Sequence, residues 1–60
     1  MIRVHRLNGE EFTLNERHIE IMEELPNTVI TLTNEHKYVV KETIAEILAL
    51  IREYKKSLNA

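Results

Sequence analysis

The spacing of apolar residues changes once along the chain, and this change constrains the fold more than any other feature. Through residues 1–40, apolar and polar residues alternate, which is the pattern of half-buried β-strands. Residues 44–58 instead have apolar side chains at the three- and four-residue spacing of an amphipathic helix. We therefore expect an α+β fold, in which short antiparallel strands form a curled sheet followed by one carboxy-terminal α-helix, in a single domain over residues 1–60.

Turn residues divide this pattern into elements. Five strands are expected at about residues 2–6, 10–14, 19–24, 28–33 and 36–41, and the helix at about 44–58. Residues 15–18 are predicted to form a polar turn between the second and third strands. Thr43 followed three residues later by Glu46 is a capping-box pattern, which predicts where the helix begins.

The first hairpin has two possible registers. A two-residue loop at Asn8 and Gly9 would place Phe12 on the polar face of the first strand. A three-residue loop over residues 7–9, with Gly9 in the left-handed conformation, instead pairs Val4 with Phe12. This second register gives one continuous apolar face, so we expect it.

The next two turns are predicted in the same way. Proline presets its backbone angle and asparagine tolerates unusual ones, so the centre of the second turn is expected at residues 26–27, which aligns Ile21 with Leu32. The third turn, at residues 33–35, is expected to copy the first, with Glu35 in the glycine position at a cost of about 1 kcal/mol. The residues expected to define the turns are Asn8, Gly9, Pro26, Asn27 and Asn34.

These registers divide the predicted sheet into two faces. The expected inner face holds Ile2, Val4, Phe12, Leu14, Ile19, Ile21, Leu25, Ile30, Leu32, Tyr38 and Val40, and the helix stripe holds Ile44, Ile47, Leu48, Ile51, Tyr54 and Leu58. The opposite face should be polar in a sheet that has one wet side, yet Val29 is predicted to lie beside Val39 there. These are either scattered surface valines or part of a subunit interface. The candidate interaction residues are Leu7, Met22, Val29, Val39 and Leu50.

Size and composition favour the interface and exclude several functions. In a chain of 60 residues with no cysteine, burial of apolar area barely offsets the entropy lost on folding, so we expect a homo-oligomer. A net charge of −2 and three aromatic residues make nucleic-acid binding unfavourable. The chain lacks a long apolar run and a signal-peptide pattern, so we expect a cytoplasmic protein that does not span a membrane.

Few side chains indicate a catalytic or metal-binding site. His5, His18 and His36 have no paired spacing and no cysteine or aspartate to complete a metal site, and their role is left open. The hydroxyl residues and the ten glutamates show no nucleophilic or acid–base motif. We therefore predict no catalytic residue, no metal, no cofactor and no small-molecule substrate, and hence a protein that is not an enzyme.

The order of these turns and strands resembles the FlbD/SwrD family of small bacterial flagellar proteins. The resemblance extends from residue 1 to about residue 56, and glutamate stands at position 35 where the family usually has glycine. It is carried by Leu7-Asn8-Gly9, Phe12, Asn15, Ile19, Ile21, Pro26, residues 28–34 (Thr-Val-Ile-Thr-Leu-Thr-Asn) and residues 38–42 (Tyr-Val-Val-Lys-Glu).

The resemblance implies a function that the spacing of apolar residues does not indicate. It implies a non-enzymatic accessory protein of flagellar and swarming motility. Such a protein would support the power of the flagellar motor through contact with a stator component, which would bring it near the membrane.

The alternative is an RNA-binding translational regulator of the carbon-storage type, which is similar in size and element order. Arg3, Arg6, Lys37 and Lys41 would be neighbours on the first and fifth strands of a curled sheet. However, Arg6 is expected to lie opposite Glu10. A solvated face of mixed charge is therefore the simpler interpretation.

Overall fold

The computed structural model describes residues 1–59, with the side chains of residues 1–56. Its elements are β1 (Ile2–His5), β2 (Glu11–Leu14), the 3-10 turn η1 (Glu16–His18), β3 (Ile19–Glu24), β4 (Thr28–Leu32), β5 (Lys37–Val40) and α1 (Ile44–Asn59). Five antiparallel strands and one helix confirm the expected α+β layout, and residues 15–18 contain a 3-10 turn. The side chain of Leu58, predicted to be on the helix stripe, lies outside the described residues.

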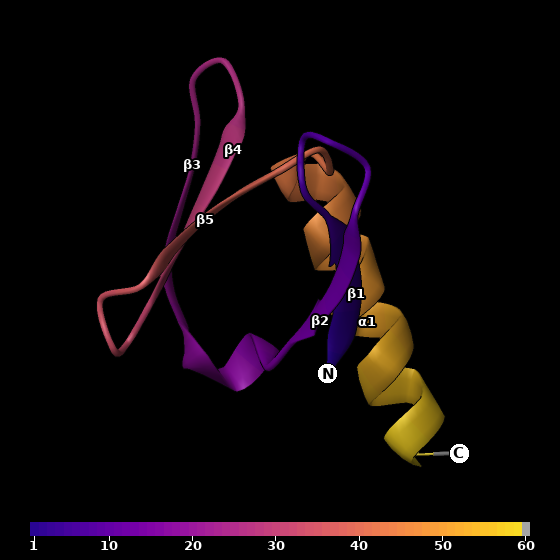
Figure 1. Ribbon diagram of the computed structural model, residues 1–60. Coiled ribbons are helices and arrows are strands. Elements are labelled where there is room, and N and C mark those ends of the chain that lie inside the picture. Colours follow the sequence, from indigo (N-terminus) through magenta and orange to yellow (C-terminus); the bar gives the residue numbers. More distant parts are fainter. Residues whose placement is uncertain (60) are drawn as a thin grey trace.

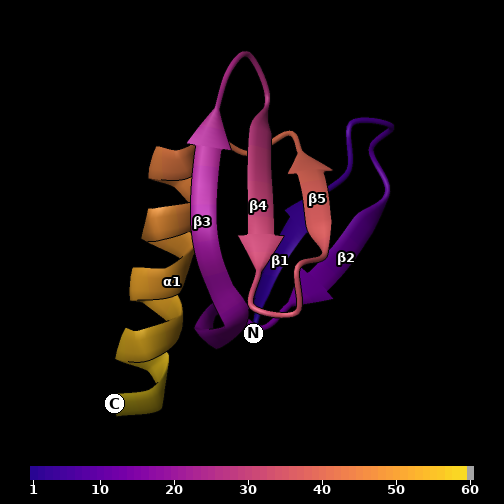
Figure 2. The ribbon, with the colours of Figure 1, turned by 90° about the vertical axis from the view of Figure 1, so that its left-hand side faces the viewer.

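The strands form two sheets that meet at one point (Figure 1). One sheet pairs β1 with β2, and the other has the order β3-β4-β5. Arg6 bridges Val40, and the Lys41 N–H donates to the His5 carbonyl at 2.9 Å. The first and fifth strands are therefore neighbours, as a curled sheet requires. The helix packs against β1 and β3 of its own chain (Figure 2).

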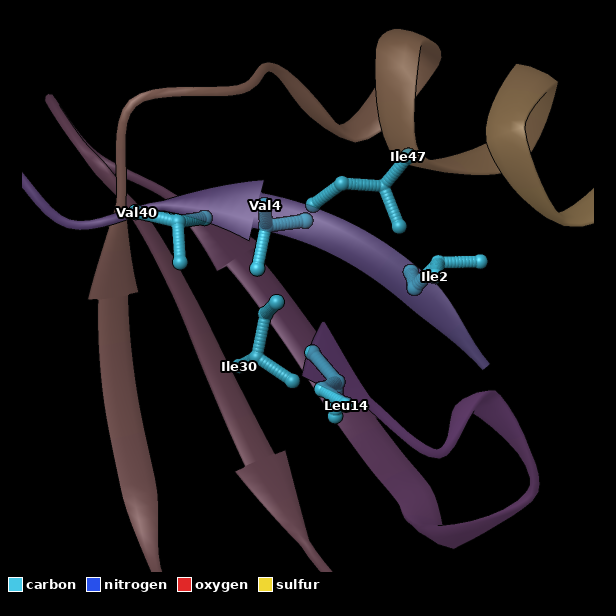
Figure 3. Packing of buried hydrophobic residues seen from close by; sticks show 6 residues of the cluster. All are labelled: Ile2, Val4, Leu14, Ile30, Val40 and Ile47. Carbon is cyan, nitrogen blue, oxygen red and sulfur yellow. The ribbon is translucent and has the colours of Figure 1, made fainter. Parts of the chain in front are cut away.

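The core lies between the two sheets and the helix (Figure 3). The buried hydrophobic side chains of the described residues are Ile2, Val4, Leu14, Ile30, Val40 and Ile47. They come from every element except β3 and the 3-10 turn, and β3 contributes half-buried side chains at Ile19 and Met22. Because each element gives the core only one or two residues, none of them can bury its apolar face alone.

The first and third turns have the same construction, as predicted. In each turn the N–H two residues after an asparagine donates to the asparagine side chain, at 2.9 Å for Asn8 and 3.0 Å for Asn34. The residue directly after each asparagine has a positive φ, which is 92° at Gly9 and 72° at Glu35. The first hairpin has the register expected for a three-residue loop. An asparagine one position before a left-handed residue thus sets two of the three hairpins.

The register predicted for the second hairpin is wrong by one residue. The turn contains three residues, Leu25, Pro26 and Asn27, and the Leu25–Pro26 peptide is cis. Ile21 consequently pairs with Thr31 and not with residue 32. Because side chains alternate between faces, a shift of one residue exchanges the two faces of β3 relative to the prediction.

This exchange changes which side chains reach the core. Met22 pairs with Ile30 and packs against the core, whereas it was predicted to lie on the opposite face. The predicted inner residues Ile21 and Leu25 are 47% and 91% exposed, so their assignment was also wrong. An irregularity in the ladder after Ile19 opposes that residue to Leu32 and returns it to the inner side.

The helix begins at the predicted capping box. The Thr43 N–H donates to the Glu46 carboxylate at 2.9 Å, and the Glu46 N–H donates to the Thr43 hydroxyl at 3.1 Å. A third contact was not predicted, because it joins distant parts of the chain: the Ile44 N–H donates to the Glu24 carboxylate at 2.9 Å. Leu48, predicted on the buried stripe, is 45% exposed.

The paired turns give a matched test of backbone conformation. Glu35→Gly should stabilise the fold by about 1 kcal/mol, since glycine adopts a positive φ without the cost that a Cβ imposes. Gly9→Ala should destabilise it by about the same amount for the same reason, although no atom outside residues 8–10 lies within 4 Å of the added Cβ. Urea unfolding of both variants measures this, and equal signs for the two changes would contradict it.

Candidate interaction surface

The described part of the chain, residues 1–59, offers no enclosed site. It forms no pocket, and it holds no group of three or more His, Cys, Asp or Glu side chains arranged to bind a metal. None of its helices has the length and apolarity needed to cross a membrane. The candidate functional features of the described residues therefore lie on the exposed surface.

The predicted interaction residues occupy different environments. Val29 and Val39 pair with each other on the side of the sheet that faces away from the core, as expected, and Val39 is 40% exposed. Leu7 is 52% exposed in the first turn. Met22 and Leu50 are half-buried against the core, so the structure does not bring them to the face of the two valines.

The shifted register adds a residue that the sequence analysis missed. With β3 turned over, Ile21 points to the same side as Val29 and Val39. We call this side of the three-stranded sheet the outer face, which consists of Ile21, Glu23, Val29, Thr31, Lys37 and Val39. A sequence analysis that gave the second turn three residues, like the other two turns, would have placed Ile21 on this face.

Among the side chains that the structure describes, the most exposed large hydrophobic one lies at the tip of the second hairpin. Leu25 is 91% exposed there, and Leu7 is exposed in the first turn. Both turns lie at the same end of the molecule (Figures 1 and 2), and we call Leu7 and Leu25 the hairpin end. Acidic residues flank both turns in the sequence: Glu10, Glu11, Glu23 and Glu24. In the sequence, the two leucines of the hairpin end therefore have mostly acidic neighbours, with Arg6 beside Leu7.

Arg6 packs on two aromatic rings. Its guanidinium carbon lies 4.6 Å from the ring centroid of Phe12 and 5.6 Å from that of Tyr38, and the two centroids are 5.4 Å apart. A cation over a ring face is attracted by the ring electrons, so this cluster links β2 of one sheet to β5 of the other. The arginine needed by the RNA-binding alternative is thus engaged within the fold, and it pairs with Glu10 through backbone atoms.

His5 and Glu42 link β1 to the segment between β5 and α1. The His5 N–H donates to Oε1 of Glu42 at 2.8 Å, and Nδ1 of the ring is 2.6 Å from Oε2, which accepts the hydrogen bond. On the other side of the ring, Nε2 is 3.6 Å from a carboxylate oxygen of Glu11. One histidine thereby connects β1, β2 and the segment before α1. His18 and His36 contribute their carbonyl oxygens to turn hydrogen bonds.

These contacts affect the pKa of Glu42. Burial of the carboxylate acts to raise its pKa, but the hydrogen bonds from the ring and backbone N–H of His5 outweigh burial. The pKa of Glu42 in the folded protein is therefore lowered. A carboxyl group whose pKa is lowered by folding stabilises the fold while it is ionised. That stabilisation is lost as the pH falls through the pKa of the folded state.

Glu42→Gln tests this contribution. The substitution should lower the free energy of unfolding by about 1–2 kcal/mol at neutral pH, since it weakens charge-assisted hydrogen bonds. The difference from the unsubstituted protein should shrink below about pH 4, where protonation of the carboxylate removes the same contribution. Urea unfolding across this pH range measures it, with Glu53→Gln on the exposed side of α1 as the control. A difference that stays constant down to about pH 3 would contradict the assignment.

Comparison with known proteins gives one match. A family model described as FlbD, flagellar and swarming motility proteins, matches residues 1–59. The comparisons with curated proteins and with solved structures found no match. The matched segment includes every strand and the helix described above.

Proposed function

Because the chain belongs to the FlbD family of flagellar and swarming motility proteins, we propose that it supports the power of the flagellar motor as a non-enzymatic accessory protein. It acts in the cytoplasm by contact with a component of the motor or its stator. Family membership supports the motility role. The proposal of a contact role rests on the exposure of Leu25, described next.

The observation that carries the proposal is a leucine with almost no protein around it. At 91% exposure, the Leu25 side chain contributes little to folding, and water contact with a large apolar side chain is unfavourable. Proline follows it, so the tip is conformationally restricted and loses little entropy on binding. A hairpin tip of this kind suits insertion into a partner's pocket.

The charge around the hairpin end indicates the chemistry of that partner. Four glutamates flank the two turns in sequence, and an acidic surround favours a surface with basic residues. We therefore propose a motor component that presents an apolar pocket bordered by lysine or arginine. The apolar contact supplies affinity, and the charges guide the approach.

The experiment compares motor torque in a strain that lacks the gene and in strains complemented with variants. Leu25→Ser should leave the folding stability within about 0.5 kcal/mol of the unsubstituted protein, because the side chain is exposed. Its torque should fall toward that of the deletion strain. Leu48→Ser, at a partly exposed leucine on α1, is the control and should retain torque.

The two parts of the proposal can fail separately. Unchanged torque in the deletion strain would contradict the motility role. Full torque with Leu25→Ser in a strain whose deletion lowers torque would contradict only the hairpin end as the contact surface.

A further inference from the structure

The outer face has a regular layout. Figure 2 looks onto it, with β3, β4 and β5 in front. Cross-strand pairing places its side chains in two rows, one of Glu23, Val29 and Val39 and the other of Ile21, Thr31 and Lys37. Strand spacing and rise make the grid roughly 10 Å across the strands and 7 Å along them. Val29 and Thr31 occupy its middle, and the other residues form its corners.

Charged and apolar corners lie on different diagonals. Glu23 on β3 is diagonally opposite Lys37 on β5, so one diagonal has an acid at one end and a base at the other. Ile21 and Val39 end the second diagonal, and they are 47% and 40% exposed. This arrangement makes the face complementary in charge to a second copy of itself.

We propose that the outer face packs against the outer face of a second copy of this chain, about a two-fold axis along the diagonal from Ile21 to Val39. When two identical sheets pack face to face with two-fold symmetry, the axis runs parallel to both sheets. An axis along this diagonal brings Glu23 close to the partner's Lys37, with a lateral offset of roughly 4 Å on this grid, and the same pair forms again on the other side. Ile21 and Val39 each meet their own counterpart.

The same pattern rules out the other simple axes. An axis along the strands lays Glu23 over the partner's Val39, and an axis across the strands lays it over the partner's Ile21. Either one buries a charge against an apolar side chain, which is unfavourable. An axis along the charged diagonal lays Glu23 over the partner's Glu23 and opposes like charges. Among these orientations, only the Ile21–Val39 diagonal pairs every charge.

The proportions of the grid set the geometry of the dimer. Reflection across its diagonal makes the strands of the two copies cross at roughly 70°, near the orthogonal class of sheet packing. The footprint is roughly 200 Å², well below the ~800 Å² per partner of a standard interface. The dimer is therefore weak and reversible, populated from high-micromolar to millimolar concentration. Its corner charges determine orientation more than strength.

Paired charge reversals test the orientation in purified protein. Glu23→Lys alone and Lys37→Glu alone should each weaken dimerisation roughly tenfold, since each places like charges together on both sides of the axis. An equimolar mixture of the two variants should dimerise as strongly as the unsubstituted protein, because each copy then supplies what the other needs. The double variant should also recover. Sedimentation equilibrium up to millimolar concentration measures all four samples.

Controls separate this effect from net charge and from folding. Glu53→Lys and Lys55→Glu on α1 change the net charge equally at exposed positions away from the outer face, and they should leave dimerisation unchanged. Circular dichroism of each variant shows whether the monomer is folded. Two misfolded variants would not regain dimerisation on mixing, so recovery in the mixture shows that the single variants lose dimerisation through their charges. High salt should weaken the dimer, because it screens the corner pairs.

Two results would overturn the inference. One is an unsubstituted protein that stays monomeric at millimolar concentration. The other is a mixture of the single variants that associates no better than either variant alone, which would show that Glu23 and Lys37 do not meet. Because these measurements use purified protein and no motor, their outcome does not depend on the proposed motility role.

Discussion

The junction between β1 and β5 is the constraint on which the rest of the structure depends. There Arg6 bridges Val40, and a hydrogen bond joins the backbones of His5 and Lys41. The junction turns two small sheets into one curled layer around a shared core. The Glu42 carboxylate accepts two hydrogen bonds from His5. The junction therefore also positions the chain immediately before the helix.

Once the interior is filled, the remaining apolar side chains have to face outward. The inner sides of both sheets and the helix supply the core, which has six buried hydrophobic residues. On the outer face and at the hairpin end, Ile21, Val39, Leu7 and Leu25 remain exposed. A chain this small has little further area to bury within itself. We propose that these surfaces contact other molecules, as described above, in a protein of the FlbD motility family.

The sequence was informative where local chemistry decides the structure and uninformative where distant segments meet. Alternation and the two asparagine turns predicted the first and third hairpins, and the capping box predicted the start of the helix. The second turn was predicted with two central residues and has three, because proline and asparagine are compatible with either loop length. The longer loop exchanged Ile21 and Met22 between the faces. The His5–Glu42 contact joins residues 37 positions apart, and no local spacing could have indicated it.

The pairing register of β3 and β4 decides which side chains of β3 face the core and which lie on the outer face. Cross-strand nuclear Overhauser effects in solution measure it directly. The structure predicts contacts that pair Met22 with Ile30 and Glu23 with Val29. Contacts that pair Ile21 with Leu32 would contradict it, because Ile21 would then point to the core and the outer face would lose an apolar corner.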